Sequence, residues 1–245
     1  MSTQTHPSIS HAANIEQNKA YFDNIADKYD TIHGAREIVG IIAKAMRGAV
    51  ELEKESTSVL DFGCGIGLLS RELAPYVKSI VGVDISEASV EVYNRLAAES
   101  DDADKMKAVV LDLQGAPGEL EDKKFDVVTS SMVYHHLDTP SLYTQILASH
   151  LAPSGKLLIA SLMRRTNFNT SSMSESMLAA IPNMAGFTEE SIKEMFEGAG
   201  LKDVKYAKIW GGVAPAPQHV KVMVPDEERV IEVFLAVGTK PEGDV

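Results

Sequence analysis

Cysteine is almost absent from this sequence: Cys64 is the only one among 245 residues. One thiol cannot form an internal disulfide, and it offers none of the paired thiolates from which many zinc sites are built. We therefore predict no metal site and a reducing compartment, the cytoplasm, as the place where the protein works.

Long apolar runs and basic clusters are also missing. No stretch of about eighteen apolar residues is present, so the sequence predicts no membrane-spanning helix and no membrane partner. The 23 Lys and Arg residues are outnumbered by 35 Asp and Glu, which gives a formal net charge of −12. Such a charge balance disfavours a phosphate backbone, so we expect no nucleic-acid partner. Residues 1–13 are polar, lack the apolar core of a signal peptide, and are expected to form a flexible tail.

Hydrophobic residues make up 44% of the chain and are arranged as strands that alternate with helices. This alternation predicts one α/β domain with a doubly wound, mostly parallel seven-stranded sheet that is covered by helices on both faces. Two late strands on either side of residues 211–225 predict an antiparallel C-terminal strand. Residues 14–50 are predicted to form an N-terminal helical extension. The expected strands are residues 59–62, 79–84, 107–113, 125–130, 156–162, 204–210 and 230–237.

The segment Val59–Gly67 has the most specific local pattern, an apolar strand followed by glycines at three alternate positions. Glycine permits a positive φ and lets a ligand approach the backbone closely. A dinucleotide-binding loop would need a third glycine where this chain has Leu68. Asp61, two residues before the first glycine, would repel a pyrophosphate and attract an ammonium or sulfonium group. An NAD-dependent oxidoreductase is therefore the weaker interpretation.

The D-x-G-x-G-x-G pattern of residues 61–67 resembles motif I of the class I S-adenosylmethionine (SAM)-dependent methyltransferases. The resemblance extends over residues 21–162 and implies a Rossmann-like fold, SAM as cofactor and S-adenosylhomocysteine (SAH) as product. Ligands of such sheets bind at the carboxyl ends of the strands. The acids that close three predicted strands, Asp61, Asp84 and Asp112, are therefore expected to converge on one site.

The second and third of these acids have specific predicted roles. Asp84 lies seventeen residues after Gly67, and its two oxygens could accept hydrogen bonds from both ribose hydroxyls, with Ile85 flanking the adenine. Its alternative role is to cap the following helix. Asp112 and Leu113 resemble the family's adenine-binding pair, although a solvent-exposed acid at a strand end is a competing interpretation.

The turn after the fourth strand supplies the next candidates. Ser130 and Ser131 occupy the position at which the family binds the methionyl amine through a backbone carbonyl. His135 follows within an H-H-L run that also resembles the family, and its imidazole is a candidate general base near neutral pH. A structural hydrogen bond is its alternative role. His135 and His136 are adjacent, which is a poor spacing for a metal pair, and no nearby acid or cysteine completes a site, so they do not predict a metal site.

Two tyrosines in the first predicted helix, Tyr21 and Tyr29, resemble those of an N-terminal helix that many small-molecule methyltransferases fold over SAM. Residues 14–50 are therefore expected to cover the cofactor site of a SAM-binding domain formed by residues 51–245. An amphipathic helix with tyrosine tips in water is the alternative. The predicted cofactor-binding residues are Tyr21, Tyr29, Asp61, Gly63, Cys64, Gly65, Asp84, Ile85, Asp112, Leu113, Ser130 and Ser131.

The acceptor site is less well defined by the sequence. Residues 163–186 are rich in methionine and are expected to form a lid insertion that shapes an apolar acceptor pocket, with a disordered insertion as the alternative. Trp210 and residues 211–225 are candidates for a further wall. The chain is expected to be a monomer or weak dimer.

We therefore predict a SAM-dependent methyltransferase that acts on an O, N or S nucleophile of a small molecule. Residues 130–133 lack the N-P-P-Y or D-P-P-Y type of run that would bind a flipped base, which also disfavours a nucleic-acid acceptor. A SAM-binding regulatory protein without catalysis is the rival hypothesis, and a protein acceptor is a further alternative.

Overall fold

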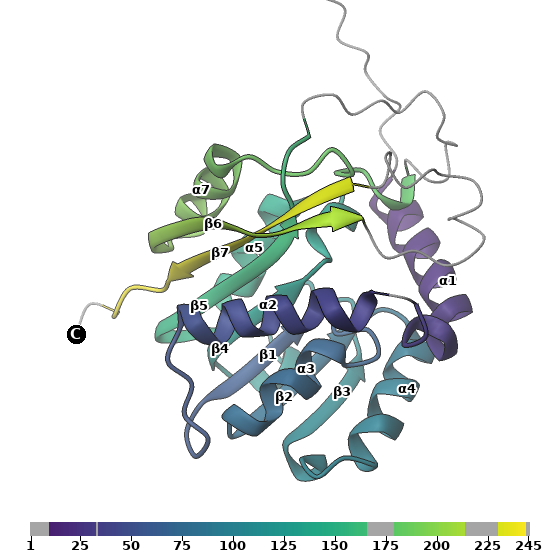
Figure 1. The fold of residues 1–245 in the computed structure, drawn as a ribbon. Coiled ribbons are helices and arrows are strands. Elements are labelled where there is room, and N and C mark those ends of the chain that lie inside the picture. Colours follow the sequence, from purple (N-terminus) through teal and green to yellow (C-terminus); the bar gives the residue numbers. More distant parts are fainter. Residues whose placement is uncertain (1–9, 33, 166–178, 214–229, 244–245) are drawn as a thin grey trace, which may run out of the picture.

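Residues 10–32, 34–165, 179–213 and 230–243 are described in the computed structural model. Within these ranges seven strands form one sheet in the order β3-β2-β1-β4-β5-β7-β6 (Figure 1). The strands are β1 Ser58–Phe62, β2 Ser79–Asp84, β3 Met106–Val110, β4 Phe125–Ser131, β5 Leu151–Leu162, β6 Lys202–Val213 and β7 Val230–Thr239.

The first five strands pair in parallel, whereas β7 runs antiparallel to both of its neighbours, β5 and β6. The predicted fold class is therefore confirmed. Apolar residues lie in both faces of the central strands because helices cover both sides. The buried strand residues divide accordingly into two clusters, one on each side of the sheet.

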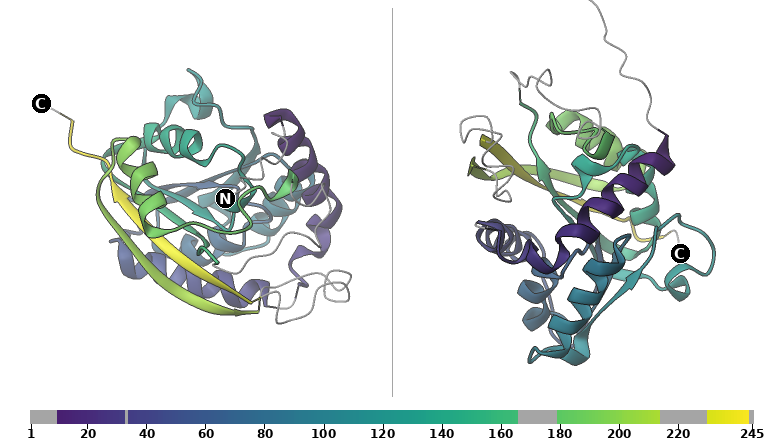
Figure 2. Two further views of the ribbon diagram at one scale, coloured as in Figure 1. Left: turned by 90° about the horizontal axis from the view of Figure 1, so that it is seen from above. Right: turned by 90° about the vertical axis from the view of Figure 1, so that its right-hand side faces the viewer.

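Helices α2, α3 and α4 supply one of these clusters, and α5 and α7 supply the other. The first helix, α1, lies beside α4 at the ends where β2 and β4 finish, as the two views in Figure 2 show. The helices are α1 His11–Tyr29, α2 Ala35–Ala49, α3 Leu68–Leu73, α4 Glu87–Ala98, α5 Pro140–Ser149 and α7 Glu189–Gly198, and a short 3₁₀ turn, η4, spans Tyr134–His136.

Several predicted boundaries were wrong, among them those of the sixth strand, which spans Lys202–Val213 instead of 204–210. Residues 11–13 belong to α1 and not to a tail, because the side chain of Ser10 accepts a hydrogen bond from Ala13 N (3.3 Å) and caps the helix. The third strand ends at Val110, so that Asp112 and Leu113 follow it. The fifth strand begins at Leu151, with an irregular register before Lys156.

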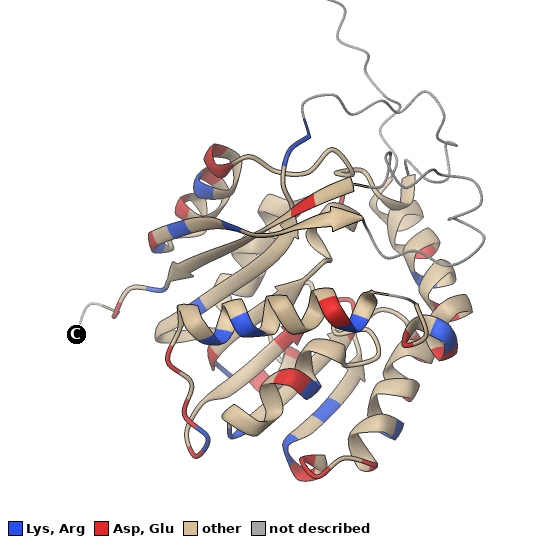
Figure 3. Ribbon diagram, in the orientation of Figure 1, with Lys and Arg blue, Asp and Glu red and all other residues tan. Residues whose placement is uncertain are grey.

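Charge is distributed without a basic face in the view of Figure 3, where Lys and Arg alternate with Asp and Glu along the helices and strand ends. Among the described residues, no helix has both the length and the apolar character needed to cross a bilayer. The predicted tail residues 1–9 lie outside the described part of the chain, as do most of the predicted lid and of residues 211–225.

Candidate active site

The glycine-rich loop between β1 and α3 has three glycines at positive φ: 67° at Gly63, 52° at Gly65 and 82° at Gly67. Two of them are required by packing. A Cβ at Gly63 would lie 2.3 Å from a methyl of Val133, and one at Gly67 would lie 2.7 Å from the ring of Tyr93. A Cβ at Gly65 would meet nothing within 4 Å. Gly65 is therefore the point at which a ligand can approach the backbone.

Four N–H groups of this loop already donate within the protein. Gly63 N and Cys64 N both donate to the carbonyl of Val83, at 2.9 and 3.1 Å. Gly65 N donates to Asp84 Oδ2 at 2.8 Å, and Gly67 N donates to Cys64 O at 2.9 Å. A pyrophosphate needs free backbone donors at this position. The loop geometry therefore disfavours a dinucleotide.

Asp61 lies within β1, and only 1% of its surface is exposed. Its carboxylate accepts hydrogen bonds from Ser70 Oγ (2.6 Å) and Thr129 Oγ1 (3.0 Å). Burial raises its pKa to about 6, although both hydroxyls oppose the shift. The carboxylate is thus held rigidly behind the glycine loop, where a cationic ligand would favour its ionised form.

Asp84 closes β2 and is half-buried beside the loop. One carboxylate oxygen accepts from Gly65 N (2.8 Å) and the other from Ser86 N (2.9 Å), and burial raises its pKa. Each oxygen therefore keeps lone-pair capacity for a ligand hydroxyl. Ser86 caps α4 through its own side chain, so Asp84 is not needed for the cap. Ile85, half-buried, follows directly.

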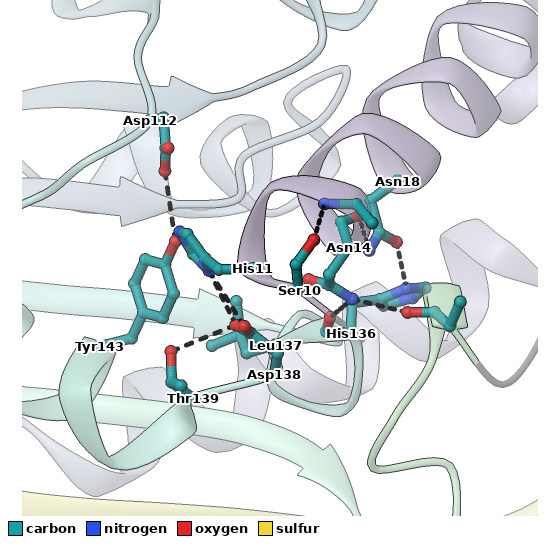
Figure 4. Close-up of polar contacts among 12 residues, drawn as sticks. Ser10, His11, Asn14, Asn18, Asp112, His136, Leu137, Asp138, Thr139 and Tyr143 are labelled. Carbon is teal, nitrogen blue, oxygen red and sulfur yellow. Dashed lines mark hydrogen bonds and ion pairs between the residues drawn. The ribbon is translucent and has the colours of Figure 1, made fainter. Parts of the chain in front are cut away.

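Asp112 and Leu113 lie in the connection after β3. Asp112 is half-buried and accepts a hydrogen bond from the hydroxyl of Tyr143 on α5 at 3.2 Å (Figure 4). The ring of Tyr143 lies 5.3 Å from that of Phe62, next to the glycine loop. The side chain of Leu113 is fully buried, so only its backbone could contact a ligand. Tyr143 was missed because its sequence position shows only a core-facing helix residue.

Cys64 was predicted to bind the cofactor, but its side chain, like that of Leu113, is buried. Its thiol is buried against Gly82, where a Cβ would lie 2.7 Å from the sulfur, and burial raises its pKa. The side chain is therefore a packing element, and only the backbone of Cys64 lies along the loop.

The end of β4 contains two buried hydroxyls, on Ser130 and Ser131, that have no hydrogen-bond partner among the described residues. Buried polar atoms are nearly always paired, so these two are expected to meet a ligand or water. Met132, the next residue, has a φ of 59°, which is strained for a residue with a side chain. The orphaned hydroxyls and the open face of Gly65 together fit SAM better than they fit a purely structural turn.

The first helix brings its tyrosines to the same side of the molecule. Burial raises the pKa of Tyr29 to about 12, and the nearby Tyr21 and Asp84 act in the same direction. Tyr21 is 40% exposed. Phe22 lies between the two, with ring distances of 5.2 Å to Tyr21 and 6.4 Å to Tyr29. Tyr29 is thus placed beside Asp84, while Tyr21 stays half in solvent.

Asp23 fastens this helix to α4 and was missed by sequence reasoning. Its carboxylate accepts from Ser86 Oγ (2.7 Å), Ala88 N (3.2 Å) and Lys19 Nζ (2.8 Å). It therefore adds a second acceptor at the N-terminus of α4, where negative charge is favoured. Nothing in the local sequence distinguishes it from a solvated helix acid.

The two histidines of η4 contact different parts of the protein. His135 is 8% exposed, and its Nδ1 lies 3.2 Å from Ser161 Oγ. His136 is half-buried, and its Nδ1 lies 2.9 Å from Asn18 Oδ1 (Figure 4). Burial lowers the pKa of His135 well below its usual range and that of His136 to about 4. Both imidazoles are therefore neutral at pH 7.

The structure describes only the ends of the two predicted acceptor walls, which are the lid of residues 163–186 and the segment 211–225. Met163 bridges Phe187, and Arg165 N donates to Ala185 O (2.9 Å), which brings the two ends of the predicted lid together. Trp210 is half-buried against the cluster on the α2 side of the sheet. The remaining lid and excursion residues lie outside the described ranges.

A separate hollow of about 400 Å³ lies between α5, α7 and residues 182–187, and none of the predicted cofactor-binding residues lines it. Within the described ranges, no three His, Cys, Asp or Glu side chains come together as a metal site. The candidate site is therefore the group of side chains at the carboxyl ends of β1, β2 and β4 under α1.

Comparisons with known proteins identify the family of this chain. A family profile described as a methyltransferase domain matches residues 22–206. An uncharacterised methyltransferase of Schizosaccharomyces pombe is 34% identical over 64% of this chain and 60% of its own length. A chloroplastic tocopherol O-methyltransferase of Arabidopsis thaliana is 29% identical over 67% of this chain and 49% of its own length. The chain thus spans roughly half of these relatives.

Among solved structures, a magnesium protoporphyrin IX methyltransferase from Synechocystis with bound SAH superimposes with a TM-score of 0.66. The match covers 93% of this chain and 99% of that one at 18% identity, so it supports the fold alone. The family match covers most of the chain and includes the glycine loop, the β4 turn and α5. The chain therefore belongs to the methyltransferase-domain family.

Proposed function

We propose that this enzyme transfers the methyl group of SAM to an O, N or S nucleophile of a small molecule, with a hydroxyl as the first candidate. The observation that supports the proposal best is the pair of neutral imidazoles on the turn that follows β4, the strand whose end carries the orphaned hydroxyls of Ser130 and Ser131. The O-methyltransferase named above, which shares 29% identity, favours oxygen.

The cofactor would be held by residues that converge from separate strands. Asp84 would accept from the ribose hydroxyls, Asp112 and the Leu113 N–H would contact the adenine, and Ile85 would flank it. Ser130 and Ser131 would meet the methionyl end, with Asp61 behind the loop as the counter-charge. Tyr29, and more peripherally Tyr21, would cover this end from α1.

SAM, when bound, supplies a methyl group that its sulfonium already activates. The chain itself mainly has to orient the acceptor, exclude water and receive a proton where the acceptor carries one. Orientation of this kind contributes about 7–11 kcal/mol in favourable cases. An imidazole that is neutral at pH 7, such as His135 or His136, can take the proton.

The first test is a calorimetric titration with SAM, SAH and NAD. We expect SAM and SAH to bind at micromolar or lower concentrations, and NAD to bind at least a hundredfold more weakly, because the loop N–H groups are already engaged. Tight binding of NAD with no response to SAM would contradict both the assignment of the loop and the proposed function.

The second test separates an enzyme from a SAM-binding regulator. Phenols, alcohols, amines and thiols are incubated with enzyme and SAM, and a gain of one methyl group is detected by mass spectrometry. We expect turnover with at least one hydroxylated small molecule. Tight SAM binding without any methylated product would favour the regulatory protein, and methylation of protein alone would favour a protein acceptor.

The remaining proposals concern the environment. We propose that the enzyme works in the cytoplasm, with no nucleic-acid or membrane partner, as a monomer or weak dimer. Sedimentation velocity over a hundredfold range of concentration measures the assembly directly.

A further inference from the structure

The η4 turn that carries the two histidines is held by asparagines from two distant segments. The carbonyl of His135 accepts from Asn183 N (3.1 Å), and that of Leu137 accepts from Asn183 Nδ2 (2.6 Å). The carbonyl of His136 accepts from Asn14 Nδ2 (3.1 Å) on α1. Three consecutive carbonyls are thus engaged, two by Asn183 and one by Asn14, so the position of the turn depends both on the segment of Asn183 and on the seating of α1.

The contacts of His136 determine which of its nitrogens carries the proton. Asn18 Nδ2 donates to the carbonyl of Asn14 (3.0 Å), which can only accept, so the amide oxygen of Asn18 faces His136 Nδ1 (2.9 Å; Figure 4). The carbonyl of Ala180, also only an acceptor, lies 3.2 Å from the same nitrogen. Nδ1 must therefore be protonated, and the lone pair is on Nε2.

His135 has no such constraint. Its Nδ1 faces the hydroxyl of Ser161, which can donate or accept, so either tautomer satisfies the contact. His135 is also the more buried of the two. The ring of His136 meets Phe22 edge-on at 5.3 Å, and Phe22 lies beside Tyr29. His136 therefore lies under α1, on the side where the cofactor residues converge.

We infer that His136, and not the neighbouring His135, receives the acceptor's proton, and that Asn18 is the residue that positions it. The inference rests on the proposed function. Since Asn18 is part of α1, the same helix that covers the cofactor site completes the base, and the base is aligned only while α1 is seated.

The proton transfer is coupled to the methyl transfer. The acceptor oxygen forms a bond to the methyl carbon while the carbon–sulfur bond breaks, and the electron pair of that bond stays on sulfur. The O–H proton passes to His136 Nε2 and later to solvent. Because this proton becomes strongly acidic as the oxygen is methylated, a weakly basic neutral imidazole is sufficient.

A histidine NMR experiment tests the positioning without any acceptor. Two-bond ¹H–¹⁵N correlations are expected to show His136 in the Nδ1–H tautomer in the wild-type protein. Asn18→Ala removes one of the two acceptors and is expected to populate the other tautomer. Asn18→Asp places a carboxylate at the same nitrogen and is expected to raise the imidazole pKa by at least one unit. An Nε2–H tautomer in the wild type would overturn the inference.

The kinetic test uses the adjacent histidines as matched variants. His136→Asn keeps a donor near the place of Nδ1, so α1 can still dock, but it has no base at Nε2. It is expected to lower kcat by about 10²–10⁴-fold with little change in SAM affinity. His135→Asn is expected to lose far less. An equal or greater loss in His135→Asn would assign the proton to His135 instead.

The variant Asp23→Ala distinguishes the alignment of His136 by Asn18 from the attachment of α1 to α4. It removes the contacts of α1 with Ser86 and Ala88 and leaves those with His136. Asn18→Ala is expected to lower kcat by about 10–100-fold, and Asn18→Asp to move the acid limb of the kcat profile to higher pH. Asp23→Ala should leave the position of that limb unchanged.

Among the described residues, the groups that face His136 are the neutral ring of His135 at 4.4 Å, the Asn18 amide, the Phe22 ring and the Ala180 carbonyl. None of these carries a charge at pH 7, so the new carboxylate in Asn18→Asp would dominate the shift. An unchanged profile in that variant, with wild-type turnover in Asn18→Ala, would overturn the role of Asn18. Failure of the wild-type enzyme to methylate any acceptor would instead overturn the proposed function.

Discussion

Replacing Asp61 with asparagine is expected to stabilise the folded protein at pH 7 while weakening its affinity for SAM at least tenfold. The folded pKa of about 6 lies above the value of about 3.9 in an unfolded chain. The folded state therefore binds more protons between these values, and its stability falls as pH rises from about 4 to 6. Removing the buried charge is expected to restore about 1–3 kcal/mol, because two pKa units correspond to roughly that amount.

The measurement is urea unfolding from pH 4 to 8, together with SAM titration over the same range. Wild-type affinity is expected to fall as pH drops below about 6, where Asp61 becomes protonated, whereas that of Asp61→Asn stays low throughout. Ser70→Ala is the matched control, since it keeps the charge and removes a donor at 2.6 Å, and it should destabilise the protein at pH 7. Unchanged SAM affinity in Asp61→Asn would remove Asp61 from the site.

Gly65→Val is expected to abolish measurable SAM binding while the chain still folds. A Cβ at this position meets no protein atom within 4 Å, so the new side chain enters the space at which the ligand approaches the loop. The positive φ of 52° adds strain of about 1–3 kcal/mol, which lowers the melting temperature without preventing folding. Calorimetry with SAM and thermal unfolding by circular dichroism measure the two effects separately.

Gly63→Ala is the informative comparison for that experiment. There the smaller substitution places a Cβ 2.3 Å from Val133, so the main expected effect is a loss of stability, with binding affected through displacement of the loop. If Gly65→Val bound SAM as tightly as the wild type, the open face of the loop would not be the ligand's path. If it failed to fold, Gly65→Ala, with less bulk at the same φ, would decide the question.

The fold was predictable because its determinants are periodic or local. The second strand has the predicted bounds, 79–84, and the fourth differs by one residue at its end. The positive φ values expected for the glycine loop are all present. The third strand ends three residues early, and Leu113 lies instead in the core cluster that includes residues of α5. That burial depends on a neighbour far away in the chain, which periodicity does not record.

The candidate site residues were likewise predictable in part: their positions at the strand ends were predicted, but their hydrogen-bond partners were not. The predicted acids Asp61, Asp84 and Asp112 do lie at neighbouring strand ends, since parallel strands place their carboxyl ends at one edge. Their immediate partners come from elsewhere in the chain: Thr129 for Asp61, and Tyr143 for Asp112. Their cofactor contacts, and the base role of His135, stay predictions that the binding and kinetic experiments address.

The sequence by itself therefore determined the α/β fold and the glycine loop, because strand periodicity and glycine spacing are encoded within a few neighbouring residues. Its resemblance to motif I predicted SAM as the methyl donor. Only the tertiary structure decided how deeply Asp61 is buried, which glycine is open to a ligand, and which nitrogen of His136 carries the proton. Burial and tautomer depend on groups more than 60 residues apart, such as Asn18 and His136, that meet only when the chain has folded.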